Sequence, residues 1–123
     1  MNTLKNTVKQ IDWYYHRNGC TTCGKSQNYL SKHKIEPKIF VDARKNTITQ
    51  DKVDSVLARV NQIYSCKGNK VDHINLSDKA HDQESILKLI IGPTGNLRAP
   101  SIIIDKTLLV GFNEETFAKI LAN

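Results

Sequence analysis

The chain has 123 residues, a length that suits one domain and suffices to bury a core without disulfide support. Its composition, 39% hydrophobic and 24% charged, excludes a disordered or fibrous protein, and no apolar run reaches membrane-spanning length. The polar first ten residues lack the apolar region of a secretory signal, so we expect a cytoplasmic protein whose structural thiols are kept reduced.

The net charge of +6 comes from the first part of the chain. Up to Lys45 there are nine lysines and arginines against three acidic residues, whereas the remainder carries nine of each. This excess would favour a thiolate and anionic partners, but a basic face kept for solubility explains it equally well. The chain has no arginine-rich tract and no aromatic RNA-binding motif, so we expect no nucleic-acid ligand.

The first predicted elements are a strand, a helix and a second strand. Residues Ile11 to Tyr15 are aromatic and branched and are followed by Asn18-Gly19, which is typical of a strand and its turn. A helix is predicted from about Thr21 to His33, and residues 38–42 (KIFVD) form the next strand. This order predicts a β-α-β unit with parallel strands.

The middle of the chain is predicted to be helical. From Thr49 to about Ile63 apolar residues recur at helical spacing, and a further helix is predicted over residues 78–91, ending at Gly92-Pro93. The residues between these helices, about 61–76, give no clear pattern beyond a turn. We therefore expect a helical insertion over about residues 49–91.

Two strands and a helix are predicted at the end of the chain. Ser101 to Ile104 and Thr107 to Val110 flank two turn residues, as in a hairpin, and Asn113 is a suitable N-cap for the last helix. The order of elements predicts an α/β protein with a thioredoxin-like fold, a mixed four-stranded sheet and an inserted helical segment. Residues 1–123 would form this single domain, with 1–10 as an N-terminal extension.

A pair of cysteines, Cys20 and Cys23, lies between the first predicted strand and the first predicted helix. Their spacing brings both sulfurs within bonding reach in the first turn of a helix. The unpaired N–H groups and the dipole at the helix start stabilise a thiolate there. The pattern therefore predicts Cys20 as the redox nucleophile and Cys23 as the residue that resolves the mixed disulfide.

Other candidate site residues surround this pair. Pro100 directly precedes a predicted strand, where a cis proline would lie opposite the cysteines and offer its neighbour's backbone to a substrate. Arg98, Arg17 and Lys25 could form an anion pocket, and each is also consistent with an ordinary surface residue. His16 could tune Cys20, hold an anion, or simply end its strand.

Two other interpretations of the cysteine pair remain open. In a structural zinc site two further ligands would come from Cys66, His73, His16 or His81, but the chain has no second cysteine pair and lacks zinc-finger spacing. The pair could also be reduced and inert. Cys66 is either a second redox partner or a small residue in a loop.

The segment HRNGCTTCGKSQNYL resembles the opening of the arsenate reductase (ArsC)/Spx-like family of thioredoxin-fold proteins. The later segment RAPSIIIDKTLLVGF is similar to that family's Arg-Pro, short hairpin and Gly-Phe ending. The resemblance implies a redox nucleophile at Cys20 and an anion-binding arginine near Arg98. Here Ala99 separates Arg98 from Pro100, and the family's other arsenate-binding arginines have no counterpart, so we expect thiol–disulfide exchange rather than arsenate reduction.

The resemblance also implies partners. A reductase of this kind would take electrons from glutathione or thioredoxin, with glutathione as a co-substrate and no bound cofactor. An alternative is a redox-switched regulatory protein of the Spx type, which would bind RNA polymerase. A zinc-bearing structural domain is the third hypothesis, and none of the three requires a membrane.

Overall fold

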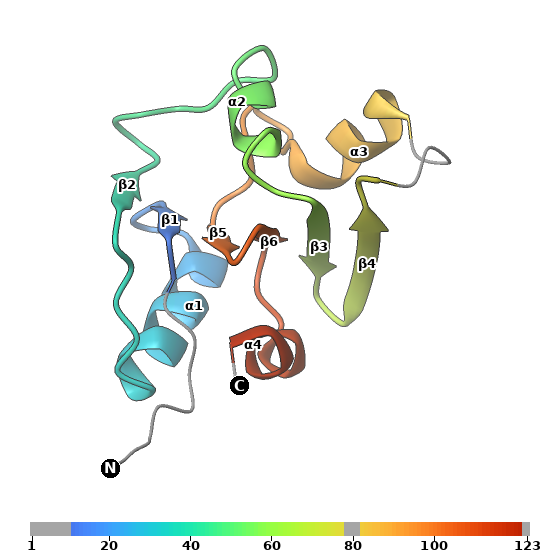
Figure 1. Ribbon diagram of the computed structural model, residues 1–123. Coiled ribbons are helices and arrows are strands. Elements are labelled where there is room, and N and C mark those ends of the chain that lie inside the picture. The colour runs from blue at the N-terminus through green and yellow to red at the C-terminus, as the bar shows by residue number, and fades with distance from the viewer. Residues whose placement is uncertain (1–10, 78–81, 122–123) are drawn as a thin grey trace.

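The computed structural model describes residues 11–77 and 82–121, which form one mixed sheet with helices on both faces (Figure 1). The strand order in this six-stranded sheet is β2-β1-β5-β6-β3-β4. The elements, in chain order, are β1 (Trp13–His16), α1 (Thr21–Lys32), β2 (Phe40–Asp42), α2 (Asp54–Leu57), β3 (Gln62–Lys67), β4 (Lys70–Asn75), α3 (Gln83–Ile90), β5 (Ser101–Ile104), β6 (Thr107–Val110) and α4 (Glu114–Leu121).

Four neighbouring strands make up the sheet that the sequence predicted. β1 pairs with β2 in parallel and with β5 in antiparallel, and β5 and β6 form the expected hairpin. The predicted β-α-β unit is therefore confirmed, and the C-terminal ends of β1 and β2 lie at the same edge of the sheet.

The predicted helical insertion is wrong in part, because β3 and β4 lie within it and extend the sheet from four strands to six. α2 is a helix of only four residues, and Ile63, expected to end a helix, is a fully buried residue of β3. β3 pairs with β6 on one side and with β4 on the other. One of its buried positions is Ser65, a polar residue whose hydroxyl donates to the Leu89 carbonyl at 2.9 Å. A polar residue at a buried position interrupts the alternation of apolar and polar residues that reveals strands in a sequence.

The predicted N-cap of the last helix, Asn113, is confirmed, whereas α3 begins later than predicted and is capped by Asp82. The side chain of Asn113 accepts the N–H of Thr116 at 3.0 Å and so caps α4. Asp82 caps α3 in the same manner, accepting the N–H of Ser85 at 2.8 Å. The first residues of the predicted helix over 78–91 lie outside the described residues. No helix in the described part of the chain is long and apolar enough to cross a membrane.

The hydrophobic core lies in two layers, one on each face of the sheet. Because side chains alternate along β1, Trp13 and Tyr15 pack towards α2 and α3, whereas Tyr14 packs towards α1 and α4. In Figure 1 these two pairs of helices lie on opposite sides of the strands. β1 is therefore buried on both faces, and the loop after it starts from a firmly held strand.

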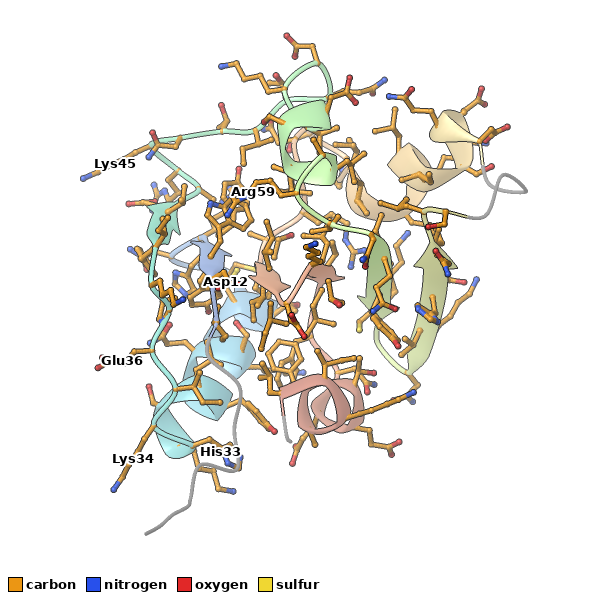
Figure 2. The ribbon with its side chains drawn as sticks, in the orientation of Figure 1. Asp12, His33, Lys34, Glu36, Lys45 and Arg59 are labelled. Carbon is orange, nitrogen blue, oxygen red and sulfur yellow. The ribbon has the colours of Figure 1, made fainter. Side chains whose placement is uncertain are left out.

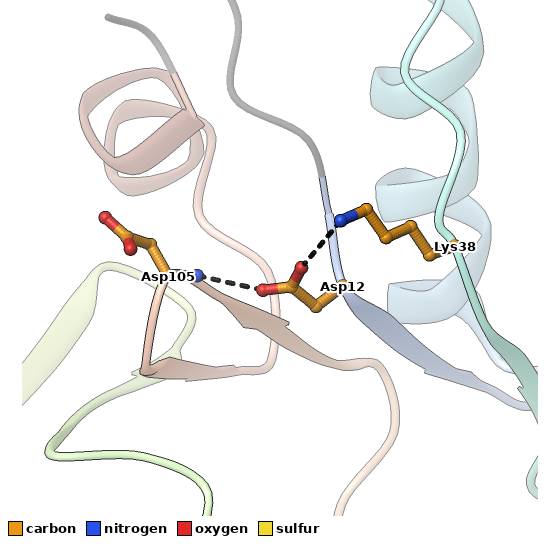
Figure 3. A network of polar contacts seen from close by, with 3 residues as sticks. All are labelled: Asp12, Lys38 and Asp105. Atoms are coloured by element: carbon orange, nitrogen blue, oxygen red, sulfur yellow. Dashed lines mark hydrogen bonds and ion pairs between the residues drawn. The ribbon is translucent and has the colours of Figure 1, made fainter.

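Asp12 links the start of β1 to two other segments (Figure 3). One of its carboxylate oxygens lies 3.7 Å from the Lys38 ammonium, and the other accepts the backbone N–H of Asp105 at 3.2 Å. Asp105 and Lys106 both have positive φ, as the two-residue turn between β5 and β6 requires. The contribution of this exposed ion pair to stability is below about 1 kcal/mol, so the contact mainly orients the segments.

Candidate functional site: the Cys20–Cys23 pair

Cys20 is the N-cap of α1. Gly19 before it has φ +84, a left-handed conformation that suits glycine and turns the chain from β1 into the helix. Cys20 itself is extended, and its Sγ accepts the N–H of Cys23 at 3.4 Å. The thiol thus takes the place that a serine or aspartate oxygen takes in most helix caps, with the exposed N–H groups of the helix start facing the sulfur.

The two sulfurs of the pair differ in environment. Cys20 is partly exposed, whereas Cys23 is fully buried and its Sγ accepts the N–H of Arg17 at 3.4 Å. Burial, together with the adjacent Cys20 thiol, raises the pKa of the Cys23 thiol well above its ordinary value. An accessible first sulfur in front of a buried, protonated second sulfur is the arrangement required of an attacking and a resolving cysteine.

Pro100 lies where the sequence predicted it. The Ala99–Pro100 peptide bond is cis, and the Cys20 Sγ lies 3.9 Å from the Ala99 carbonyl oxygen. The Pro100 carbonyl accepts the N–H of Gly111 at 2.8 Å, which ties this segment to the end of β6. The backbone next to Pro100 is therefore held beside the Cys20 sulfur.

A buried chain of hydrogen bonds, which the sequence did not reveal, supports the cysteine turn from below. The Ser26 hydroxyl donates to the Cys23 carbonyl at 2.9 Å and lies 2.8 Å from the Tyr14 hydroxyl. Because the single proton of Ser26 goes to Cys23, Tyr14 is the donor to Ser26. Burial raises the pKa of Tyr14 to about 12, so this donor keeps its proton. Ser26 lies three residues after Cys23, a helical spacing from which its hydrogen bond to the Cys23 carbonyl could have been predicted.

Ser26→Ala is expected to destabilise the fold by about 1 to 3 kcal/mol, since it leaves the buried Tyr14 hydroxyl without its acceptor. Urea unfolding of the wild type and the variant measures this loss. Ser31→Ala is the matched control, because Ser31 lies exposed on the same helix. The double variant with Tyr14→Phe should recover part of the lost stability. If Ser26→Ala lowered the free energy of unfolding no more than Ser31→Ala does, the hydrogen bonds of Ser26 would have no stabilising role.

A pocket of about 270 Å³ opens beside Cys20. Arg17, which follows β1, and Arg44, which comes two residues after β2, both line it. Arg17 was predicted as a site residue, whereas Arg44 was missed. The parallel pairing of β1 and β2 could have identified Arg44, since residues that follow neighbouring parallel strands meet at one edge of the sheet.

The structure does not bring Arg98, Arg17 and Lys25 into one pocket. Arg98 and Lys25 line a different pocket, of about 310 Å³, which includes Cys66 but neither Arg17 nor Cys20. The Arg98 guanidinium donates to the hydroxyl of Ser65 at 3.0 Å and to the carbonyls of Leu89 and Cys66 at 2.9 and 2.6 Å. These bonds join the segment before β5 to β3 and α3. That Arg98 binds an anion stays a prediction.

His16 ends β1 in a largely apolar environment. Only 9% of it is exposed, and its ring centre lies 5.4 Å from that of Tyr14 and 5.7 Å from that of Phe40. Burial lowers the pKa of His16, against the opposing charge of Asp42, so the ring is neutral at neutral pH. A neutral ring attracts an anion weakly, and its influence on Cys20 stays a prediction.

The described residues offer little support for a structural zinc site. No three histidine, cysteine, aspartate or glutamate side chains among residues 11–77 and 82–121 come together as a metal would need. Cys66 is buried in β3 rather than in a loop, and His73 stacks on Tyr64 with its Nε2 2.8 Å from Gln62 Oε1. His81 lies outside the described residues.

The sheet order, the cysteine pair at the start of α1 and the cis proline beside it define a thioredoxin-like protein. The chain belongs to the ArsC family, whose model matches residues 15–120. This confirms the family resemblance seen in the two sequence segments.

Several relatives of this chain are named as regulators. The Global transcriptional regulator Spx of Bacillus subtilis is 26% identical to this chain, over 87% of the chain and 84% of the relative. Spx of Staphylococcus epidermidis is 30% identical, over 83% and 80%, and the Regulatory protein MgsR of Bacillus subtilis is 24% identical, over 87% of each.

Proposed function

We propose that this protein exchanges thiols and disulfides through Cys20 and Cys23. The Cys20 thiolate attacks a substrate disulfide, forms a mixed disulfide and releases the distal substrate sulfur as a thiolate. Cys23 then loses its proton and attacks Cys20, which releases the second substrate thiol and leaves a Cys20–Cys23 disulfide. A thiol reductant, glutathione or thioredoxin, would return the pair to its reduced state. The reducing conditions of the cytoplasm would maintain that state.

The observation that carries this proposal is the placement of the two sulfurs. Cys20 is the accessible cap of α1, and Cys23 is buried directly behind it in the same helical turn. The Ala99 carbonyl, 3.9 Å from the Cys20 sulfur, lies where the backbone of a bound substrate could pair with the chain.

A redox titration tests the proposal. The protein is equilibrated with glutathione buffers of increasing oxidising strength, and the loss of two hydrogen atoms is followed by mass spectrometry. We expect one transition that joins Cys20 to Cys23, that persists in Cys66→Ser and that is absent in Cys20→Ser. A protein that forms no such disulfide under oxidising buffers, or a transition that survives Cys20→Ser, would contradict the proposal.

A second candidate function is a redox-switched regulatory protein. The similarity to proteins named Spx and MgsR supports it, as do the exposed Ile39 and Phe40 at the sheet edge, which are 51% and 57% exposed. The proposed partner is RNA polymerase. Pull-downs with purified RNA polymerase are expected to recover the protein in one redox state and not in the other. Equal recovery in both states, or recovery in neither, would count against a switch.

A further inference from the structure

The charged residues that line the pocket beside Cys20 are all positive. Arg17 and Arg44 line it together with the polar residues Thr47, Thr94 and Asn96, and none of its described lining residues is acidic. The two arginines come from separate loops that the parallel pairing of β1 and β2 brings together. A ligand that enters this pocket therefore meets two guanidinium groups next to the reactive sulfur.

Neither of these guanidinium groups makes a hydrogen bond or an ion pair with the protein among residues 11–77 and 82–121. The hydrogen bonds of Arg17 and Arg44 there are made by their backbone N–H groups, to Cys23 and Asp42. The ion pairs described lie elsewhere, at Lys38–Asp12 and Lys88–Glu84. By contrast, the guanidinium of Arg98 is occupied by three acceptors. Arg17 and Arg44 are thus the arginines at this site that remain available to a ligand.

The chemistry of the pocket suits an anionic group such as a carboxylate. Guanidinium groups bind carboxylates through paired, charge-assisted hydrogen bonds, and threonine hydroxyls and the asparagine amide can donate to the same oxygens. The pocket volume of about 270 Å³ accommodates a side chain of the substrate. Because Cys20 lies at the wall of the pocket, that side chain would belong to a residue next to the disulfide under attack.

We propose that Arg17 and Arg44 hold a carboxylate of the substrate, so that Cys20 reacts preferentially with disulfides of acidic peptide segments. This inference rests on the proposed thiol–disulfide exchange and names its substrate class. The Cys20 thiolate forms a bond to the substrate sulfur nearer the pocket, the substrate S–S bond breaks, and the distal sulfur leaves as a thiolate. No outside oxidant is needed, because the substrate disulfide accepts the electron pair.

The test compares three symmetric peptide disulfides that differ only in the residues flanking cysteine: glutamate, glutamine or lysine. The rate of Cys20 reaction with each is measured at low ionic strength. We expect the glutamate peptide to react at least about fivefold faster than the glutamine peptide, and the lysine peptide to react more slowly, because two arginines contribute. Glutathione disulfide is the fourth substrate and shows whether a small carboxylate-bearing disulfide is preferred over a peptide.

The variants Arg17→Gln and Arg44→Gln locate the effect. Each is expected to lower the ratio of glutamate to glutamine rates by about two- to threefold, and the double variant should abolish the preference. Lys34→Gln is the charge-matched control, because Lys34 follows α1 at the far end from Cys20, about 18 Å along the helix, and points away from the protein (Figure 2). It should leave the ratio unchanged.

Each outcome decides a different statement. Equal rates with all three peptides would overturn the carboxylate pocket but leave the exchange reaction intact. If the preference for the glutamate peptide survives in the double variant, or falls as much in Lys34→Gln as in the arginine variants, it arises from the general positive charge of the protein. Either result would also overturn the carboxylate pocket. A preference for glutathione disulfide without one for the glutamate peptide would overturn the peptide class. No reaction with any disulfide would overturn the proposed function itself.

Discussion

Replacing Cys23 by serine is expected to trap this protein on its substrate. The Cys20 sulfur remains accessible in the variant and can still attack a disulfide, but no second thiol lies behind it to release the product. The mixed disulfide between Cys20 and the substrate should therefore accumulate to nearly one per chain, whereas the wild type passes through it. Intact-mass measurement after brief exposure to a disulfide peptide detects the adduct directly.

The other two cysteines provide the controls for this experiment. Cys20→Ser should form no adduct, because Cys23 is fully buried and burial keeps its thiol protonated. Cys66→Ser should behave as the wild type, because Cys66 is 1% exposed and burial raises the pKa of its thiol. An adduct that forms on Cys66, or a Cys23→Ser variant that turns over like the wild type, would show that the roles are assigned wrongly.

Replacing Arg98 by leucine is expected to cost about 3 kcal/mol or more of folding free energy, since it leaves several partly buried acceptors without a charged donor. The guanidinium joins the Ser65 hydroxyl and the carbonyls of Leu89 and Cys66, and so connects β3, α3 and the segment that holds Pro100. Gly111, with φ +83, leaves the space it needs, because a Cβ there would lie 3.0 Å from the Arg98 Nη2. Urea unfolding measures the loss.

Arg98→Lys serves as the intermediate variant, since one ammonium group cannot reach all three acceptors that the planar guanidinium joins. It should recover only part of the lost stability. Arg59→Gln is the control, because Arg59 is exposed and its guanidinium carbon lies 5.9 Å from the centre of the Trp13 ring. If Arg98→Leu were no less stable than Arg59→Gln, a stabilising role of the Arg98 hydrogen bonds between β3, α3 and the Pro100 segment would be excluded.

The hydrogen-bond partners of Arg98 could not be predicted from its motif alone. Its position two residues before Pro100 suggested an anion ligand, and the same position in the structure points its guanidinium at the carbonyls of β3 and α3. That the acceptors lie 9 to 33 residues away along the chain explains why no local pattern revealed them. Two other arginines line the pocket beside Cys20: Arg17, which follows β1, and Arg44, from the loop after β2.

Local features of this protein could be derived from the sequence alone. The cysteine spacing, the turn at Gly19 and the strand before it placed Cys20 at the start of a helix, and the strand after Pro100 placed that proline at the site. Capping of α4 by Asn113 followed from its side chain. These features depend on contacts between residues a few positions apart, which a sequence records directly.

Other features were decided only by the tertiary structure. β3 pairs with β6 in parallel and with β4 in antiparallel, which are contacts between distant segments. The buried Ser65 interrupts the apolar alternation that would have marked β3 as a strand, and its hydrogen-bond acceptor, the Leu89 carbonyl, lies 24 residues away along the chain. The meeting of Arg17 with Arg44, and the burial of Cys23 over Ser26 and Tyr14, depend on strand register and helix packing. The sequence thus placed Cys20 at the start of a helix, and the packing of distant segments decided which charges surround its sulfur.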